Sequence, residues 1–206
     1  MDRNKYKILG LLLLWFGISY AQSNQTPLQI LNKTINLITN AKGAEARFTI
    51  YNSGYSGAGI IKSFGNKFIV TLPDAEIWYN GKDLYTYNKN AGETTVVVPT
   101  AEELAESNPL AYVTGAGKNY NVAISTVKKT DRDVLELTPK SKSGIKRITL
   151  TIRKTDAKPE KIVVEPLHGN PITAEISSFK TGLNFPPADF EYPKSKYPKV
   201  EIVDLR

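Results

Sequence analysis

Few residues in this 206-residue chain could support acid–base, nucleophilic or metal chemistry. The chain has one histidine, His168, and no cysteine. His168 precedes Gly169-Asn170 in a predicted turn, and we interpret it as a solvated turn residue. A zinc site there would need three carboxylates to complete it, which is a poor ligand set. No G-x-S-x-G elbow supports a Ser-His-Asp site. The sequence therefore predicts neither a catalytic site nor a metal site.

Local structure explains the remaining candidates for chemistry. Glu102 and Glu103 lie at a predicted helix start, where acidic side chains stabilise the helix dipole. Asp131 and Asp133 lie in a predicted turn, and the glycines between residues 54 and 59 lack the strand–loop–helix context of a phosphate-binding loop. The chain is instead rich in aromatic residues, with 7 Phe, 11 Tyr and 2 Trp. This profile favours a binding protein without a cofactor over an enzyme.

Residues 1–21 have the three parts of an export signal. Basic side chains at positions 3, 5 and 7 precede an apolar core at residues 8–18, and residues 19–21 (Ser-Tyr-Ala) form a small-x-small cleavage site. The apolar core is too short to span a bilayer comfortably. We therefore expect cleavage after Ala21 and an exported protein made of residues 22–206. Without cysteine it can form no disulfide and offers no lipobox.

The formal net charge of +7 raises the question of a nucleic-acid or membrane partner. Lysine and arginine are interspersed with aspartate and glutamate, and they form no basic stripe. We interpret the charge as a solvated surface and expect no nucleic-acid partner. Residues 22–206 contain no repeat and no domain boundary, and their number suffices for one substantial core. The prediction is a single monomeric domain.

The predicted elements begin with a helix and continue mainly as strands. Thr26-Pro27-Leu28-Gln29 supplies an N-cap, a first-turn proline and a glutamine at N3. Apolar residues at positions 28, 31, 35 and 38 predict an amphipathic helix that Lys42-Gly43 ends. Strands are predicted in residues 44–98 and 120–203, about eleven in all, and consecutive strands should pair antiparallel. So wide a sheet must curl or close.

Two short helices are predicted between the two groups of strands. Thr100-Ala101-Glu102-Glu103 is a capping sequence, Asn108-Pro109 breaks the helical segment, and Thr114-Gly115 ends it. An interrupted segment of this kind can be a movable cover over the sheet. An ordinary crossover helix is the alternative.

The stretch Ala75–Pro99 predicts a three-stranded meander. Asn80-Gly81 predicts a two-residue type I′ turn, which would place Ile77 opposite Leu84 and Trp78 opposite Asp83. The two faces would then hold Trp78, Tyr85 and Tyr87 on one side and Ile77, Tyr79 and Leu84 on the other. Because both faces are apolar, both must be covered, or one must stay open for a ligand.

Five motifs follow one another across nearly the whole of residues 22–206. They are Phe48-Thr49, Asn80–Tyr87 (NGKDLYTY), Asn108-Pro109-Leu110, Leu135–Lys140 (LELTPK), and Phe190–Pro193 (FEYP) with Val200–Asp204. Each motif is weak by itself, but their order and spacing make the match specific. In this order they resemble the periplasmic outer-membrane lipoprotein carrier family, LolA.

The resemblance implies a mainly β fold, a curved antiparallel half-barrel covered by an N-terminal amphipathic helix and a lid of short helices. It also implies a non-catalytic periplasmic chaperone. Members take acylated lipoproteins from an inner-membrane lipoprotein-releasing transporter and carry them to an outer-membrane acceptor. The alternatives are a half-barrel module that senses lipoproteins or lipids without transporting them, and a secreted hydrolase that would depend on His168.

For acyl binding we expect one set of apolar residues on the lid and on one face of the sheet. On the lid these are Leu104, Leu110 and Tyr112, and on the sheet they are Phe48, Ile50, Phe68, Val70, Trp78, Tyr85, Tyr87, Val96 and Val98. The opposite face, with Ile77, Tyr79 and Leu84, is the alternative, and plain core packing is the alternative for each residue. The family often holds its lid shut with a basic residue in a K/R-R-P triplet. Ser63-Phe64-Gly65 stands there in this chain, and Arg47 is a candidate substitute.

Overall fold

A computed structural model describes residues 25–39, 42–127 and 129–206. The predicted signal peptide, with its cleavage site after Ala21, lies outside the described residues. Within these residues, no helix combines the length and the apolar character needed to cross a membrane.

One sheet of twelve strands organises the described residues. The strands are β1 (Ala44–Asn52), β2 (Tyr55–Phe64), β3 (Lys67–Thr71), β4 (Ala75–Tyr79), β5 (Leu84–Asn88), β6 (Glu93–Val97), β7 (Tyr120–Ile124), β8 (Arg132–Pro139), β9 (Ile145–Arg153), β10 (Pro159–Pro166), β11 (Ile172–Thr181) and β12 (Glu201–Asp204). The α-helices are α1 (Pro27–Thr39), α2 (Ala101–Ser107), α3 (Ala111–Thr114) and α4 (Ala116–Asn119), and two 3-10 turns are η1 (Pro187–Phe190) and η2 (Lys194–Lys196). The predicted fold class is confirmed: a mainly β, largely antiparallel open sheet with an N-terminal helix and short internal helices.

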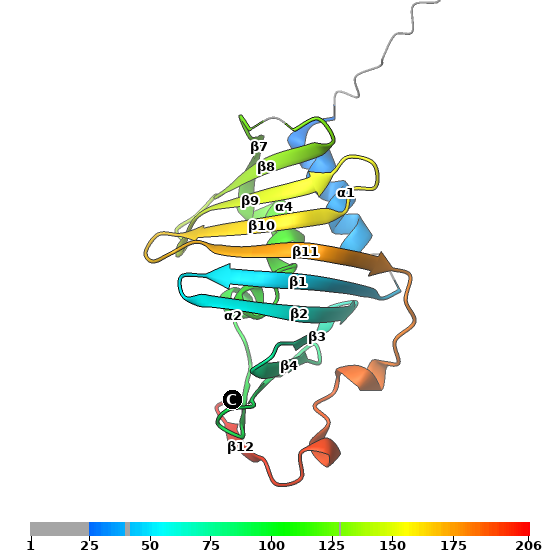
Figure 1. Cartoon of the computed structure of the whole chain (residues 1–206), viewed down its shortest axis with the longest axis vertical. Helices are drawn as coiled ribbons and strands as arrows, with labels where there is room; N and C mark the ends of the chain where they lie inside the picture. The colour runs from blue at the N-terminus through cyan, green and yellow to red at the C-terminus, as the bar shows by residue number, and fades with distance from the viewer. Residues whose placement is uncertain (1–24, 40–41, 128) are drawn as a thin grey trace, which may run out of the picture.

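The strand order is β12-β6-β5-β4-β3-β2-β1-β11-β10-β9-β8-β7. Two antiparallel meanders, β1–β6 and β7–β11, therefore join where β1 pairs with β11. The strands are stacked along the long axis of the molecule, with α1, α2 and α4 behind them (Figure 1). Because β6 and β7 lie in different meanders, the connection through α2, α3 and α4 must cross the helix-side face of the sheet.

The last strand departs from the expected antiparallel pairing of consecutive strands. β12 pairs parallel with β6, and it does not pair with β11, the preceding strand. The long connection after β11 explains the difference, because it carries the chain past β1–β5 to the far edge of the sheet (Figure 1).

Both predicted helix starts are confirmed by reciprocal capping hydrogen bonds. The backbone N–H of Thr26 donates to Gln29 Oε1 at 2.8 Å, and the N–H of Gln29 donates to Thr26 Oγ1 at 3.2 Å. Thr100 and Glu103 form the same capping box at α2. The buried stripe of α1 differs from the predicted one, because Ile30 is buried whereas Leu28 is 46% exposed. Helix α1 is described over Pro27–Thr39, and the predicted stop at Lys42-Gly43 lies outside the helix.

The β4–β5 connection is longer than the predicted two-residue turn. Tyr79 pairs with Leu84 and Trp78 with Tyr85, so the predicted pairs were wrong and the loop has four residues, Asn80–Asp83. Asn80 Oδ1 accepts hydrogen bonds from the backbone N–H groups of Lys82 (3.0 Å) and Asp83 (2.9 Å), which stabilises the loop. Because each partner shifts by two positions, the two predicted faces keep their members.

A C-terminal strap, residues 182–206, covers the outer face of β2–β6, the face turned away from the helices. Phe190 is fully buried, and its ring lies 6.2 Å from Phe64 and 6.1 Å from Phe185. Tyr192 stacks on Tyr85, with ring centroids 5.1 Å apart, and meets Trp78 edge-on. The strap therefore covers the outer aromatic face.

We predict that Phe190→Ala destabilises the protein by about 3–5 kcal/mol, because it removes a fully buried ring from the strap. Leu205→Ala, whose side chain is 63% exposed in the same strap, is the matched control and should change stability by less than about 0.5 kcal/mol. Urea unfolding of both variants measures the difference. Equal effects would contradict the strap's structural role.

Candidate functional site

The helix-side face of the sheet is closed in its middle by buried apolar contacts. Leu31 of α1, Leu110 before α3, and Val113 and Ala116 are almost fully buried in one cluster with side chains of the sheet, among them Phe48. Space between helices and sheet is therefore left only at the sides of this contact.

Helices α2 and α3, residues 101–114, form the lid over the remaining space. No residue of α2 is buried, whereas Leu110 and Val113 are 3% and 2% exposed. Asn108, between the helices, accepts a hydrogen bond from the backbone N–H of Leu110 at 2.8 Å. Leu110 and Val113 therefore anchor the lid, and α2 lies on the sheet with little burial to hold it.

The first cavity, pocket A, has a volume of about 380 Å³ and lies between the lid and strands β1, β9, β10 and β11. Its floor is apolar, and its wall on the lid side holds two carboxylates and one phenol. It is lined by Ile50, Glu102, Glu106, Pro109, Tyr112, Gly144, Ile145, Ile162, Val164, Pro166, Ile172 and Ala174.

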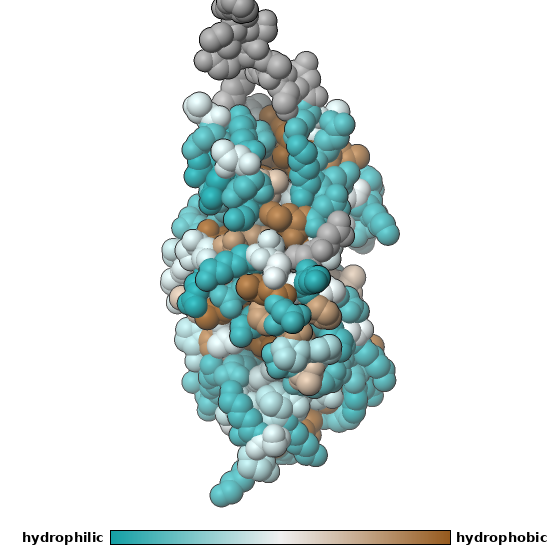
Figure 2. Space-filling model, turned by 90° about the vertical axis from the view of Figure 1, so that its right-hand side faces the viewer, coloured by the Kyte–Doolittle hydropathy of each residue, from teal (hydrophilic) through white to brown (hydrophobic). Residues whose placement is uncertain are grey.

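Two further cavities border the lid. Pocket B, of about 450 Å³, lies between the end of α1, the β2–β3 turn and the lid, with Ile38, Phe68, Tyr79, Leu104 and Leu110 in its lining. The side of the molecule that carries the end of α1 is seen in Figure 2, where apolar side chains gather near mid-height among hydrophilic ones. Pocket C, of about 280 Å³, shares Glu102, Tyr112 and Ile145 with pocket A. All three cavities meet at the lid.

Tyr112 lies at the boundary of pockets A and C. Burial raises the pKa of its hydroxyl to about 12, and the charges of Glu106 and Glu102 act in the same direction. The hydroxyl therefore stays neutral at ordinary pH and can donate a hydrogen bond into either pocket.

Several predicted residues lie on the helix side. Ile50 and Tyr112 line pocket A, and Phe68, Leu104 and Leu110 line pocket B. Phe48 and Val70 belong to the same buried cluster but are only 3% and 2% exposed. The sequence reasoning missed the floor of pocket A, although the alternation of apolar residues in β10 and β11 could have indicated it. The missed residues are Ile145, Ile162, Val164, Ile172 and Ala174.

The other predicted residues do not line these pockets. Trp78, Tyr85 and Tyr87 contact the strap on the outer face, Val96 pairs with Tyr85, and Val98 follows β6 with 57% exposure. The assignment of one common face was wrong at the β3–β4 connection. Phe68 pairs with Tyr79 and Val70 with Ile77, so their face continues into the alternative set, Ile77, Tyr79 and Leu84.

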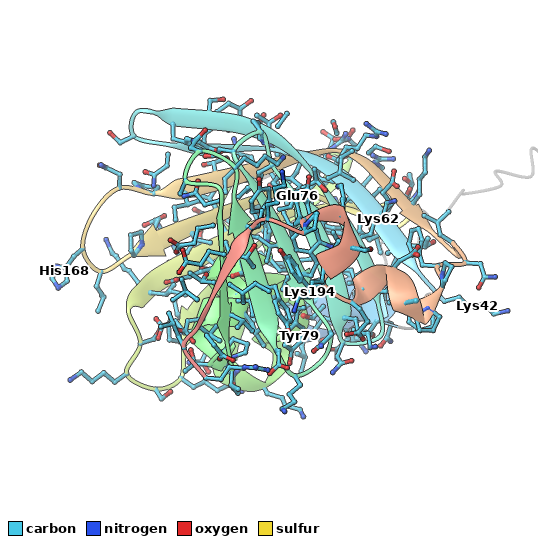
Figure 3. The ribbon with its side chains drawn as sticks, turned by 90° about the horizontal axis from the view of Figure 1, so that it is seen from below. Lys42, Lys62, Glu76, Tyr79, His168 and Lys194 are labelled. Carbon is cyan, nitrogen blue, oxygen red and sulfur yellow. The ribbon has the colours of Figure 1, made fainter. Side chains whose placement is uncertain are left out.

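Of the positions considered for a lid latch, Ser63 and Gly65 line pocket B beside lid residues, whereas Phe64 and Arg47 do not. Phe64 stacks on Phe190, and Arg47, 57% exposed, lies 3.9 Å from Glu45. Arg47 alternates with the buried Ala46 and Phe48, so it faces outward and does not substitute for a latch. In the described part of the chain, no ion pair joins the lid to the sheet. His168 lies at the far end of the β10–β11 loop (Figure 3).

The chain matches a family model described as "Outer membrane lipoprotein carrier protein LolA" over residues 18–166. A search of curated proteins gives no match. A crystal structure of an uncharacterized conserved protein from Thermus thermophilus superposes with a TM-score of 0.60 and 13% identity, over 85% of this chain and 97% of that one. A putative outer membrane lipoprotein-sorting protein domain from Vibrio parahaemolyticus gives a TM-score of 0.50 and 12% identity, over 84% and 98%. At these identities the structural likeness supports the fold alone.

The raised pKa of Tyr112 gives a stability test. Because its folded-state pKa of about 12 lies above the unfolded value of about 10, the neutral hydroxyl contributes stability that is fully present below about pH 10 and is lost as the pH rises toward 12. We predict that wild type loses more unfolding free energy than Tyr112→Phe over this range. Urea unfolding at several pH values measures both curves. If the unfolding free energies of the two proteins fall with pH in parallel, the raised pKa of Tyr112 is contradicted.

Proposed function

The chain belongs to the outer membrane lipoprotein carrier (LolA) family, and on this premise we propose that it binds the acyl chains of lipoproteins between its lid and its sheet and carries them between the inner and outer membranes. Carriers of this family are periplasmic proteins without catalytic activity. A signal peptide at residues 1–21, cleaved after Ala21, would place this chain in the same compartment.

The observation that carries the proposal is pocket A, an apolar cavity under a lightly held lid. Its volume of about 380 Å³ lies within the range of about 300–1,000 Å³ typical of ligand pockets. Each methylene buried there would contribute about 0.8 kcal/mol, so a chain of roughly sixteen carbons offers on the order of 13 kcal/mol before ordering costs are subtracted.

Lid displacement would enlarge the site. Pro109 lines pocket A and its neighbour Leu110 lines pocket B, so this segment of the lid separates the two cavities. Its outward movement would join them into one trough along the sheet. The acyl chains would then take the place of Leu110 against the apolar face, where Leu110 is now 3% exposed.

The same contact would make release possible. When the carrier is empty, Leu110 and Val113 fill the apolar face, and binding must first undo this burial, which lowers the apparent affinity for acyl chains. A carrier needs such a limit on affinity, because it must pass its cargo to an acceptor. We propose an inner-membrane lipoprotein-releasing transporter as the donor and an outer-membrane acceptor as the recipient.

We predict that the purified protein binds a synthetic triacylated lipopeptide and not the same peptide without acyl chains. Ile172→Trp, which fills pocket A, should weaken binding at least about tenfold, because two lost methylene contacts suffice for that change. Isothermal titration measures the affinities.

Ile124→Trp is the matched control, since Ile124 lies on β7 with 49% exposure and does not line pocket A. It should bind as wild type does. Absence of lipopeptide binding by a folded wild-type protein would contradict the carrier function. Unchanged lipopeptide binding by Ile172→Trp would contradict the role of pocket A in acyl binding.

A further inference from the structure

The charged side chains that line pocket A are both acidic. Among its lining residues only Glu102 and Glu106 are charged, and they lie four residues apart on α2, on the same face of the helix. The rest of the lining is apolar except for Tyr112, whose hydroxyl is neutral. Any head group at this part of the pocket therefore meets negative charge.

In the described residues, no Lys, Arg or His nitrogen forms an ion pair with Glu102 or Glu106 within 4.0 Å. Lys142 lines pocket C, which shares Glu102 with pocket A, but it is not among the residues that line pocket A. Glu103, also on α2, is turned back to Thr100 in the capping box.

The Glu102 carboxylate lies close to the β8–β9 loop. A Cβ added at Gly144 would lie 3.2 Å from Glu102 Oε1, so the bare glycine leaves the space that the carboxylate uses. Gly144 and Glu102 both line pocket A, one from the β8–β9 loop and one from the lid. The carboxylate therefore stands where the lid meets the sheet, at the border of the apolar cavity.

Resting on the proposed acyl-binding function, we infer that pocket A selects acyl chains with a neutral or cationic head group against those with an anionic one, and that Glu102 and Glu106 determine this specificity. The apolar lining binds any acyl chain, so the chain alone gives no discrimination. One unit charge in contact with another at 4 Å in water changes an affinity about fivefold. The amide- and ester-linked head of an acylated peptide is accepted, and free fatty acids and anionic phospholipids are disfavoured.

Three probes with the same twelve-carbon chain test this inference: dodecyl maltoside (neutral), dodecyltrimethylammonium (cationic) and laurate (anionic). Their affinities are measured at low salt by displacement of a neutral fluorescent acyl probe from wild type and from Glu102→Gln/Glu106→Gln. In the variant we expect laurate to bind about fivefold to tenfold tighter and the cation to bind weaker by a similar factor, with the maltoside unchanged. Added salt should reduce the difference in affinity between wild type and the variant for both charged probes.

Glu201→Gln is the control for a general change in net charge, because Glu201 is an exposed carboxylate on β12, outside the lining of pocket A. It should leave all three affinities unchanged. If the maltoside does not bind wild type, the acyl-binding function itself fails. If it binds, and the double variant shifts the affinities for laurate and the cation in the same direction or not at all, the selectivity is overturned and acyl binding stands.

Discussion

The structure depends on one constraint: strands β3–β6 carry apolar side chains on both faces, so both faces must be covered. The outer face receives a fixed cover, in which Phe190 is fully buried and Tyr192 stacks on Tyr85. The inner face is covered in part by the lid. No residue of α2 is buried, and the lid is anchored through Leu110 and Val113. Apolar burial scales with the area removed from water, so α2 is the part of the lid that costs least to displace.

This difference between the two covers links the fold to the proposed function. A carrier must hide acyl chains from water and also give them up, and a lid that fills the empty site with its own apolar residues serves both needs. The cavities of about 380, 280 and 450 Å³ all border the same segment. In the proposed function, movement of that segment would change the size of the site without requiring a change in the pairing of the sheet from β12 to β7.

Local features of the chain could be predicted from the sequence, because neighbouring residues determine them. The capping partners of Thr26 and Thr100 and most of the strands belong to this group. The face of the sheet that binds could not be predicted in the same way. Side-chain alternation identifies the two faces within one strand, but the β3–β4 connection changes which residues continue a face, as the pairing of Phe68 with Tyr79 shows. Nor did any local signal indicate that the strap would cover Trp78 and Tyr85, because that contact joins segments more than a hundred residues apart.

The most direct test of the movable lid is a distance between the lid and the sheet in the same sample with and without cargo. The chain has no cysteine, so Ser107→Cys/Lys146→Cys carries spin labels at two positions only, one at the end of α2 and one on β9, and neither residue lines pocket A, B or C. Pulsed electron paramagnetic resonance then measures the label separation before and after saturation with a triacylated lipopeptide. The account predicts a longer separation in the bound state. An unchanged distance at full occupancy would show that acyl chains bind without lid movement and would contradict it.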